Sequence, residues 1–111
     1  MERIIVNGIE VPVRFSITGM FEVLESKNKG LGDLSNLTFL EILDICWMAV
    51  RVGCRRAGQE NPFKSKDDFF DAIDDDTAAI ERFTVAMNKS MESLDNSEAE
   101  KNGKAQAKAK Q

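Results

Sequence analysis

Residues 3–15 read Arg-Ile-Ile-Val-Asn-Gly-Ile-Glu-Val-Pro-Val-Arg-Phe, which is two apolar runs separated by one Asn-Gly pair. Both residues of such a pair tolerate the positive φ angles of a type I′ turn, so the stretch predicts a β-hairpin with a two-residue turn. This turn pairs Val6 with Ile9 and Ile4 with Val11, placing four apolar side chains on one face. We expect another element to cover that face.

The second strand of this hairpin contains a proline. In the predicted register, Pro12 lies opposite Arg3, at a position whose N–H would point away from the first strand. A proline there removes no hairpin hydrogen bond and blunts the outer edge of its strand. The alternation of the strand places Val11, Val13 and Phe15 on one face and Pro12 on the other.

A first helix is predicted over residues 17–27, directly after the hairpin. Ser16 is suited to be its N-cap, and Gly19 weakens it. A loop of Asn, Lys and Gly follows from Asn28. One buried stripe is predicted from the residues at helical spacing, which are Ile17, Met20, Phe21 and Leu24.

The strongest helix start in the chain is at Thr38, with Glu41 three residues later. This spacing is a capping box, and it opens a helix predicted over residues 39–57. Gly58 is a suitable C-terminal stop. Apolar residues lie on most faces of this helix, so we expect it to be central and buried, with Trp47 in the core.

Two further helices and a tail complete the prediction. A short helix is expected over 66–73, capped by Ser65, and a last amphipathic helix over 77–94, capped by Asp76. Residues 95–111 contain no apolar residue larger than Ala, which predicts a disordered polar tail. The sequence therefore predicts an α+β fold: one domain over residues 1–94, with an N-terminal β-hairpin packed on a bundle of about four helices.

Composition excludes several classes of function. The chain has 111 residues, 19 acidic and 15 basic, and its net charge of −4 argues against nucleic-acid binding. It contains no histidine, so catalytic pairs and metal sites that need one are excluded. Cys46 and Cys54 are expected to be small buried residues. No stretch predicts a signal peptide or a membrane span, so we expect a cytoplasmic chain.

No motif predicts catalysis, a cofactor, a metal or a small-molecule substrate. The acidic stretch 67–81 fails as a calcium loop because Ala78 and Ala79 stand where a ligand and a glycine are needed. Its acids are expected at helix N-termini and in solvent. Arg51, Arg55 and Arg56 are expected to pair with that stretch or to be solvated.

The apolar residues of the last two helices and of the turn before them exceed what a small core needs. Some are expected in the core, and exposed Phe or Met side chains would suit an adaptable partner groove. The candidate partner-binding residues are Phe63, Phe69, Phe70, Phe83, Met87 and Met91.

The order of these elements resembles the tail assembly chaperones of long-tailed phages and prophages. The resemblance runs over residues 3–93 and starts with the hairpin N-G-x-x-V-P-V-R-F from Asn7 to Phe15. A helix with Glu22 and Glu25 follows, then the long apolar helix with its central Trp, an acidic short helix, an amphipathic helix and a polar tail.

The resemblance implies a non-catalytic chaperone of virion morphogenesis that binds the tape measure protein and tail tube subunits in the host cytoplasm and is absent from the mature virion. It implies self-association, because coating a long rod needs many copies. It also implies a longer form made by ribosomal frameshift, with which Gly103-Lys104 is compatible. The alternatives are a structural or connector protein of the particle, a small regulatory adaptor and, after these, an enzyme.

Overall fold

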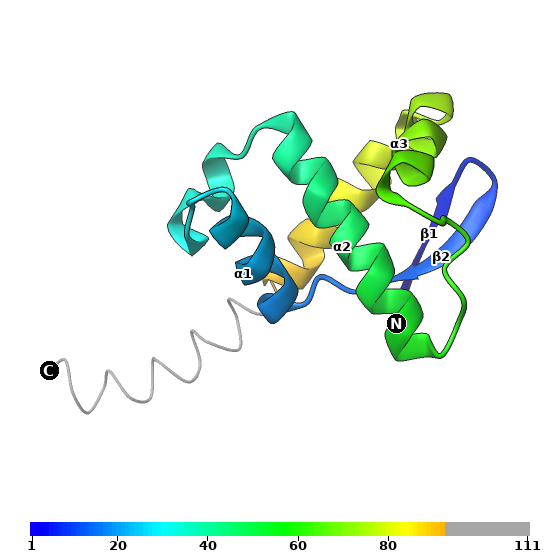
Figure 1. Cartoon of the computed structure of the whole chain (residues 1–111), viewed down its shortest axis with the longest axis horizontal. Helices are drawn as coiled ribbons and strands as arrows, with labels where there is room; N and C mark the ends of the chain where they lie inside the picture. The colour runs from blue at the N-terminus through cyan, green and yellow to red at the C-terminus, as the bar shows by residue number, and fades with distance from the viewer. Residues whose placement is uncertain (93–111) are drawn as a thin grey trace, which may run out of the picture.

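The structure is a computed structural model that describes residues 1–92, apart from the side chains of residues 31, 34 and 35. It has the predicted α+β fold: a two-stranded antiparallel hairpin is followed by four α-helices (Figure 1). The predicted tail 95–111 and the predicted end of the last helix at residue 94 lie outside the described residues.

The hairpin consists of β1 (Glu2–Val6) and β2 (Ile9–Val13). Its register is the predicted one, since Val6 pairs with Ile9, Ile4 with Val11 and Arg3 with Pro12. The turn residues Asn7 and Gly8 have φ angles of 50° and 81°, as a type I′ turn requires. The turn chemistry of the Asn-Gly pair therefore fixes which backbone groups of each strand face outward.

Side-chain caps begin the first three helices. Helix α1 (Ile17–Ser26) starts at Ser16, whose Oγ accepts from the N–H of Gly19 at 3.0 Å. Helix α2 (Phe39–Ala57) has the predicted capping box and ends at Gly58, which is in the left-handed region. Helix α3 (Lys66–Asp75) starts at Ser65, and the last helix covers residues 78–92 of the described chain.

Two local predictions need correction. The segment after α1, expected to be a loop, contains a 3-10 helix, η1 (Leu31–Asn36), in which the carboxylate of Asp33 accepts from the N–H of Gly30 at 2.9 Å. Helix α3 extends to Asp75, two residues past the predicted end. Asp74 and Asp75 are still helical, and the backbone leaves the helix at Asp76.

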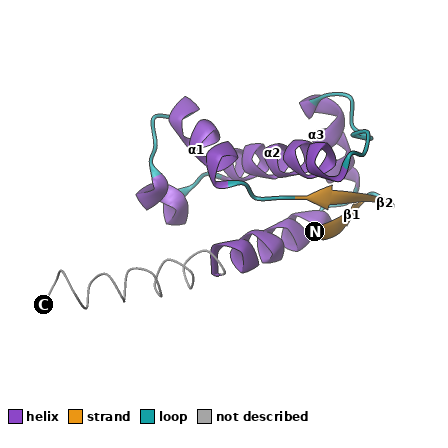
Figure 2. Ribbon diagram, turned by 90° about the horizontal axis from the view of Figure 1, so that it is seen from below, coloured by secondary structure: helices purple, strands orange, loops and turns teal. Residues whose placement is uncertain are grey.

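The elements form layers around the hairpin. Helices α1, α2 and α3 lie on one side of the strands and the last helix lies on the other, as Figure 2 shows. Helix α2 packs against β2 closely enough that a Cβ at Gly53 would overlap the carbonyl group of Pro12. The N–H of Arg14 also donates to the carbonyl of Ala49 in α2, at 3.0 Å.

This close approach changes the environment of Pro12. The sequence places Pro12 on an outer edge, but its side chain is fully buried because α2 covers that side of β2. Conversely Ile9, predicted on the covered face, is 39% exposed beside the turn. The strand pairing was predicted correctly. Which side chains of β2 are buried, however, depends on where α2 packs against the strand.

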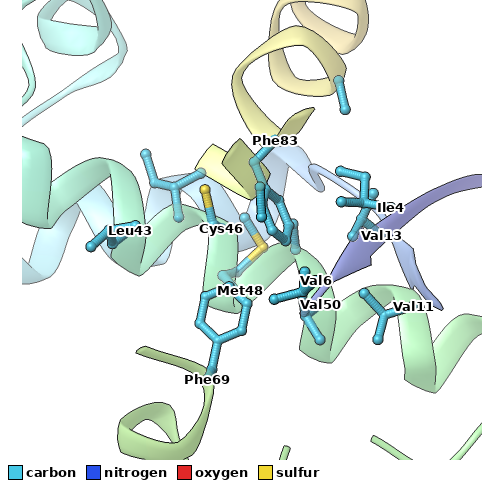
Figure 3. Packing of buried hydrophobic residues seen from close by; sticks show 14 of the residues in the cluster. Ile4, Val6, Val11, Val13, Leu43, Cys46, Met48, Val50, Phe69 and Phe83 are labelled. Carbon is cyan, nitrogen blue, oxygen red and sulfur yellow. The ribbon is translucent and has the colours of Figure 1, made fainter. Parts of the chain in front are cut away.

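The core joins all layers. Figure 3 shows side chains from the hairpin, α2, α3 and the last helix converging in one cluster, with Phe83 and Phe69 both completely buried. Trp47, expected in the core, is partly buried and packs on Phe69. In α1 only half of the predicted stripe is buried, since Met20 and Leu24 face the core while Ile17 and Phe21 are exposed.

The narrow contact of α1 with α2 explains that correction. Gly19 lies against Met48 of α2, so closely that a Cβ would overlap the sulfur of that residue. The approach is therefore centred on Gly19 and Met20, and residues further around the helix, such as Ile17 and Phe21, are left outside the contact.

Candidate interaction surfaces

An aromatic cluster occupies the centre of the molecule. The ring of Phe69 lies 5.4 Å from that of Trp47, 5.4 Å from that of Phe63, 6.0 Å from that of Phe70 and 5.6 Å from that of Phe83, measured between centroids. Two of these pairs meet edge to face, which is a favoured geometry for aromatic rings. The cluster joins α2, α3 and the last helix.

Three of the six predicted partner-binding residues are therefore core residues: Phe63, Phe69 and Phe83. A partner cannot reach them on the folded chain, and their helical spacing reflects packing. The other three are half-buried and packed against the core; they are Phe70, Met87 and Met91. Each of these offers a partner only part of its side chain.

The exposed apolar surface lies elsewhere. At the start of α2, Phe39 is 50% exposed and Leu40 is 65% exposed, and on α1 Ile17 and Phe21 are each 41% exposed. Helical spacing did not single out Leu40, because it shares a face with Asp44 and Arg51 but also with Trp47, which was expected in the core. The other large exposed apolar residues are Met1, Ile5, Ile9 and Val85.

A groove of about 580 Å³ runs between β1 and the last helix. The first wall is formed by residues 2–5 of β1. The second is one face of the last helix at helical spacing, formed by Ala78, Glu81, Arg82 and Val85. The groove thus combines apolar side chains with charges of both signs, and no residue of either wall was among the predicted site residues.

Asp76 and Arg82 fix the end of this groove. The carboxylate of Asp76, predicted to cap the last helix, instead accepts from the backbone N–H of Asn7 at 2.9 Å and from Nη1 of Arg82 at 2.9 Å. The same Nη1 donates to the carbonyl of Ile5 at 2.8 Å. The hydrogen bond from Asn7, together with Arg82, lowers the pKa of Asp76 below its ordinary value. These bonds tie the hairpin to the start of the last helix.

Ion pairs attach α2 to its neighbours. Asp44 lies 2.8 Å from Nζ of Lys27 and 3.2 Å from Nζ of Lys66. Partial burial would raise the pKa of Asp44, but these two ammonium groups outweigh it and hold the pKa below its ordinary value. Glu41 pairs with Lys29 at 2.7 Å; that bond and the N–H of Thr38 lower its pKa to about 2.

The remaining charged clusters show no assembled site among the described residues. Arg51, Arg55 and Arg56 are exposed and form no ion pair with another residue of 1–92, which favours solvation over pairing with the acidic stretch. No three acidic or cysteine side chains in that part of the chain are arranged as metal ligands. Cys46 and Cys54 are buried as predicted, and burial raises the pKa of Cys46 to about 12.

Comparisons with protein-family models, with curated proteins and with solved structures find no match to this chain. Within residues 1–92, none of the helices has the length and apolar character to cross a bilayer.

Proposed function

We propose that this protein is a non-catalytic phage tail assembly chaperone, which binds the tape measure protein and tail tube subunits in the host cytoplasm and leaves before the virion matures. Support comes from the element order in the sequence and from one structural observation: two adjacent large apolar residues, Phe39 and Leu40, are exposed at the start of the central helix. Adjacent exposed apolar side chains of this size suit a protein partner.

We expect the partner to pack an apolar surface on exposed apolar side chains of this protein, with charged side chains beside the contact. Phe39 and Leu40, exposed side by side at the start of α2, act as the anchors. Glu41, in the same first turn of α2, pairs with Lys29 and supplies charge beside the anchors. A partner helix that presents an apolar face would bury these side chains and gain roughly 25 cal/mol for each Å² removed from water.

The test is co-expression with the longest protein encoded next to this gene. We expect that protein to become soluble and to co-purify with many copies of the chain. Replacing both anchors, Phe39→Asp with Leu40→Asp, should abolish co-purification, while the helix itself tolerates acids in its first turn. The matched control, Arg55→Ala with Arg56→Ala, makes the same change in net charge at the other end of α2 and should retain the partner.

Other outcomes identify the alternatives. Recovery of the chain in purified particles would make it a structural or connector protein. Capture of one partner at equal stoichiometry would make it a regulatory adaptor. If the long protein stays insoluble while this chain elutes alone, the chaperone proposal is wrong.

A further inference from the structure

The hairpin leaves a set of backbone groups on the outer edge of β1. Because the turn is closed by the pair Val6–Ile9, hydrogen-bonded pairs alternate along the ladder, and Arg3 and Ile5 belong to the pairs whose N–H and C=O groups point outward. A contact confirms this alternation: Arg82 reaches the outward carbonyl of Ile5.

Most of these outward groups have no partner. The carbonyl of Ile5 accepts from Arg82, but the N–H of Ile5 and both the N–H and the C=O of Arg3 make no hydrogen bond with any described residue. On β2 the corresponding edge is partly covered, because α2 packs against the backbone of Pro12 and Val13, while the outward groups of Glu10 beside the turn make no hydrogen bond with any described residue. Pro12 has no N–H there, and Arg14 donates to Ala49 of α2.

The groove lies directly beside this open edge. Its exposed apolar side chains are Ile5 on one wall and Val85 on the other, 49% and 51% exposed. They supply surface on which an added side chain can pack. An unpaired strand edge next to an apolar wall is the arrangement in which proteins accept an extended peptide as an extra strand.

The charges that line the groove determine which side chains a partner strand must have. Arg82 is held by Asp76 at 2.9 Å, and Arg3 lies 3.6 Å from Glu10. Glu2 and Glu81, by contrast, are exposed and form no ion pair with another residue of the described part. The uncompensated charge that lines the groove is therefore negative.

We propose that the outer edge of β1 is a strand-addition site for an extended segment of a partner protein, in which apolar residues alternate with Lys or Arg. The partner backbone pairs with Arg3 and with the N–H of Ile5. Its apolar side chains pack on Ile5 and Val85, and its basic side chains face Glu2 and Glu81.

Two other occupants fit less well. A second copy of the chain would add two more unpaired acids, its own Glu2 and Glu81, to a groove whose uncompensated charge is already negative, which is unfavourable. Residues 95–111 supply lysines but no apolar side chain larger than Ala to fill the groove. The site is separate from the Phe39–Leu40 surface. The strand-addition site goes beyond the proposed function, because any protein segment that alternates apolar and basic residues could occupy it, whether or not that protein is the tape measure protein.

Two proline variants isolate the edge. Arg3→Pro removes an outward N–H from β1, and Glu10→Pro removes one from β2; both positions lie in non-hydrogen-bonded pairs, so neither variant breaks a hairpin bond. Both also remove the Arg3–Glu10 contact. The probe is a synthetic, end-capped heptapeptide of alternating valine and lysine, titrated into the ¹⁵N-labelled full chain. A peptide with glutamate in place of lysine is the charge control.

We expect the lysine peptide to shift the amide signals of Arg3 and Ile5 and to protect both amides from hydrogen exchange. Glu10→Pro keeps the outward N–H of Arg3 and should bind the peptide only slightly more weakly than the original chain, because it leaves the Arg3 charge unpaired. Arg3→Pro should bind it about tenfold or more weakly, and the glutamate peptide should bind more weakly than the lysine peptide. Circular dichroism checks that both variants fold. If Arg3→Pro does not fold, Val85→Lys replaces it and should weaken binding as well, because it removes an apolar side chain from the groove wall and repels the lysines of the peptide.

Three results would overturn the site. These are no shift at Arg3 and Ile5, equal binding by the two proline variants, or a concentration-dependent dimer of the original chain that Arg3→Pro abolishes, which would identify a second copy as the occupant. The peptide experiment does not use the long neighbouring protein. Failure of the chaperone proposal and failure of the strand site are therefore read out separately.

Discussion

The two strands of the hairpin differ in how much of each edge the rest of the chain uses. β2 is met by α2, which contacts its backbone at Pro12 and accepts a hydrogen bond from Arg14 at Ala49. The outer edge of β1 is contacted by the last helix through Arg82, and it retains outward groups at Arg3 and Ile5 without hydrogen-bond partners among residues 1–92. Both strands contribute buried side chains to the core, but their edges differ: the edge of β2 is packed against α2, and the edge of β1 is left open beside the groove.

The largest expected effect is a difference in stability between substitutions on the two sides of the last helix. Phe83 is completely buried against Phe69, whereas Val85, two residues later, is half exposed in the groove. We expect Phe83→Ala to lower the free energy of unfolding by about 4 kcal/mol, because it leaves a cavity in the core. Val85→Ala should change it by less than about 0.5 kcal/mol. Urea unfolding of both variants measures the difference, and similar losses would show that the groove wall is part of the core.

The next effect tests the contact of α2 with β2. A Cβ at Gly53 would overlap backbone atoms of Pro12 and Val13, which cannot move without shifting a strand. We expect Gly53→Ala to cost about 3 kcal/mol of stability. Gly19→Ala is the matched control, since its Cβ would meet only the flexible side chain of Met48, and it should cost about 1 kcal/mol. Thermal unfolding would contradict this interpretation if the two glycines tolerated alanine equally.

These contacts also show what local sequence could predict. The Asn-Gly pair fixed the strand register, and Ser16, Thr38 and Ser65 marked the starts of three helices, because caps and turns are decided within a few residues. The buried state of Pro12 was not predictable in this way. It depends on Gly53, forty-one positions later, whose missing side chain lets α2 touch the strand.

The candidate site was harder to predict than the fold. Phe63, Phe69 and Phe83 carry the apolar spacing of an interaction stripe, but that spacing is the same for core packing, and burial decided between the two. The open edge of β1 follows from the predicted register. Its availability, however, depends on which strand α2 covers, and that is a property of tertiary packing.

A smaller effect concerns the end of the groove and depends on pH. Hydrogen bonds from Asn7 and Arg82 lower the pKa of Asp76 below its ordinary value near 3.8. A carboxylate with a lowered folded-state pKa stabilises the fold above its unfolded pKa, and this contribution is lost as the pH falls through the folded pKa. We expect Asp76→Asn to reduce the loss of stability on acidification below about pH 4.

The comparison for Asp76 is Asp74→Asn, which removes one negative charge from an exposed position of α3. Chemical unfolding at a series of pH values down to about 2 gives the two profiles. Asp44 and Glu41, whose pKa values are also lowered, remain in both variants, so the acid dependence should become shallower without vanishing. If the Asp76→Asn and Asp74→Asn profiles coincide, the bonds between the turn and the last helix do not contribute to stability.

The smallest effect concerns the ion pair that crosses the hairpin. Arg3 lies 3.6 Å from Glu10, and both side chains are about half exposed, at 46% and 60%. An exposed pair gains little because water screens the charges and because two long side chains must be ordered. A double-mutant cycle with Arg3→Ala and Glu10→Ala should therefore give a coupling energy below about 0.5 kcal/mol. A coupling above about 1 kcal/mol would mean that Arg3 is held in place, and the edge of β1 would then be less open than its unpaired backbone groups indicate.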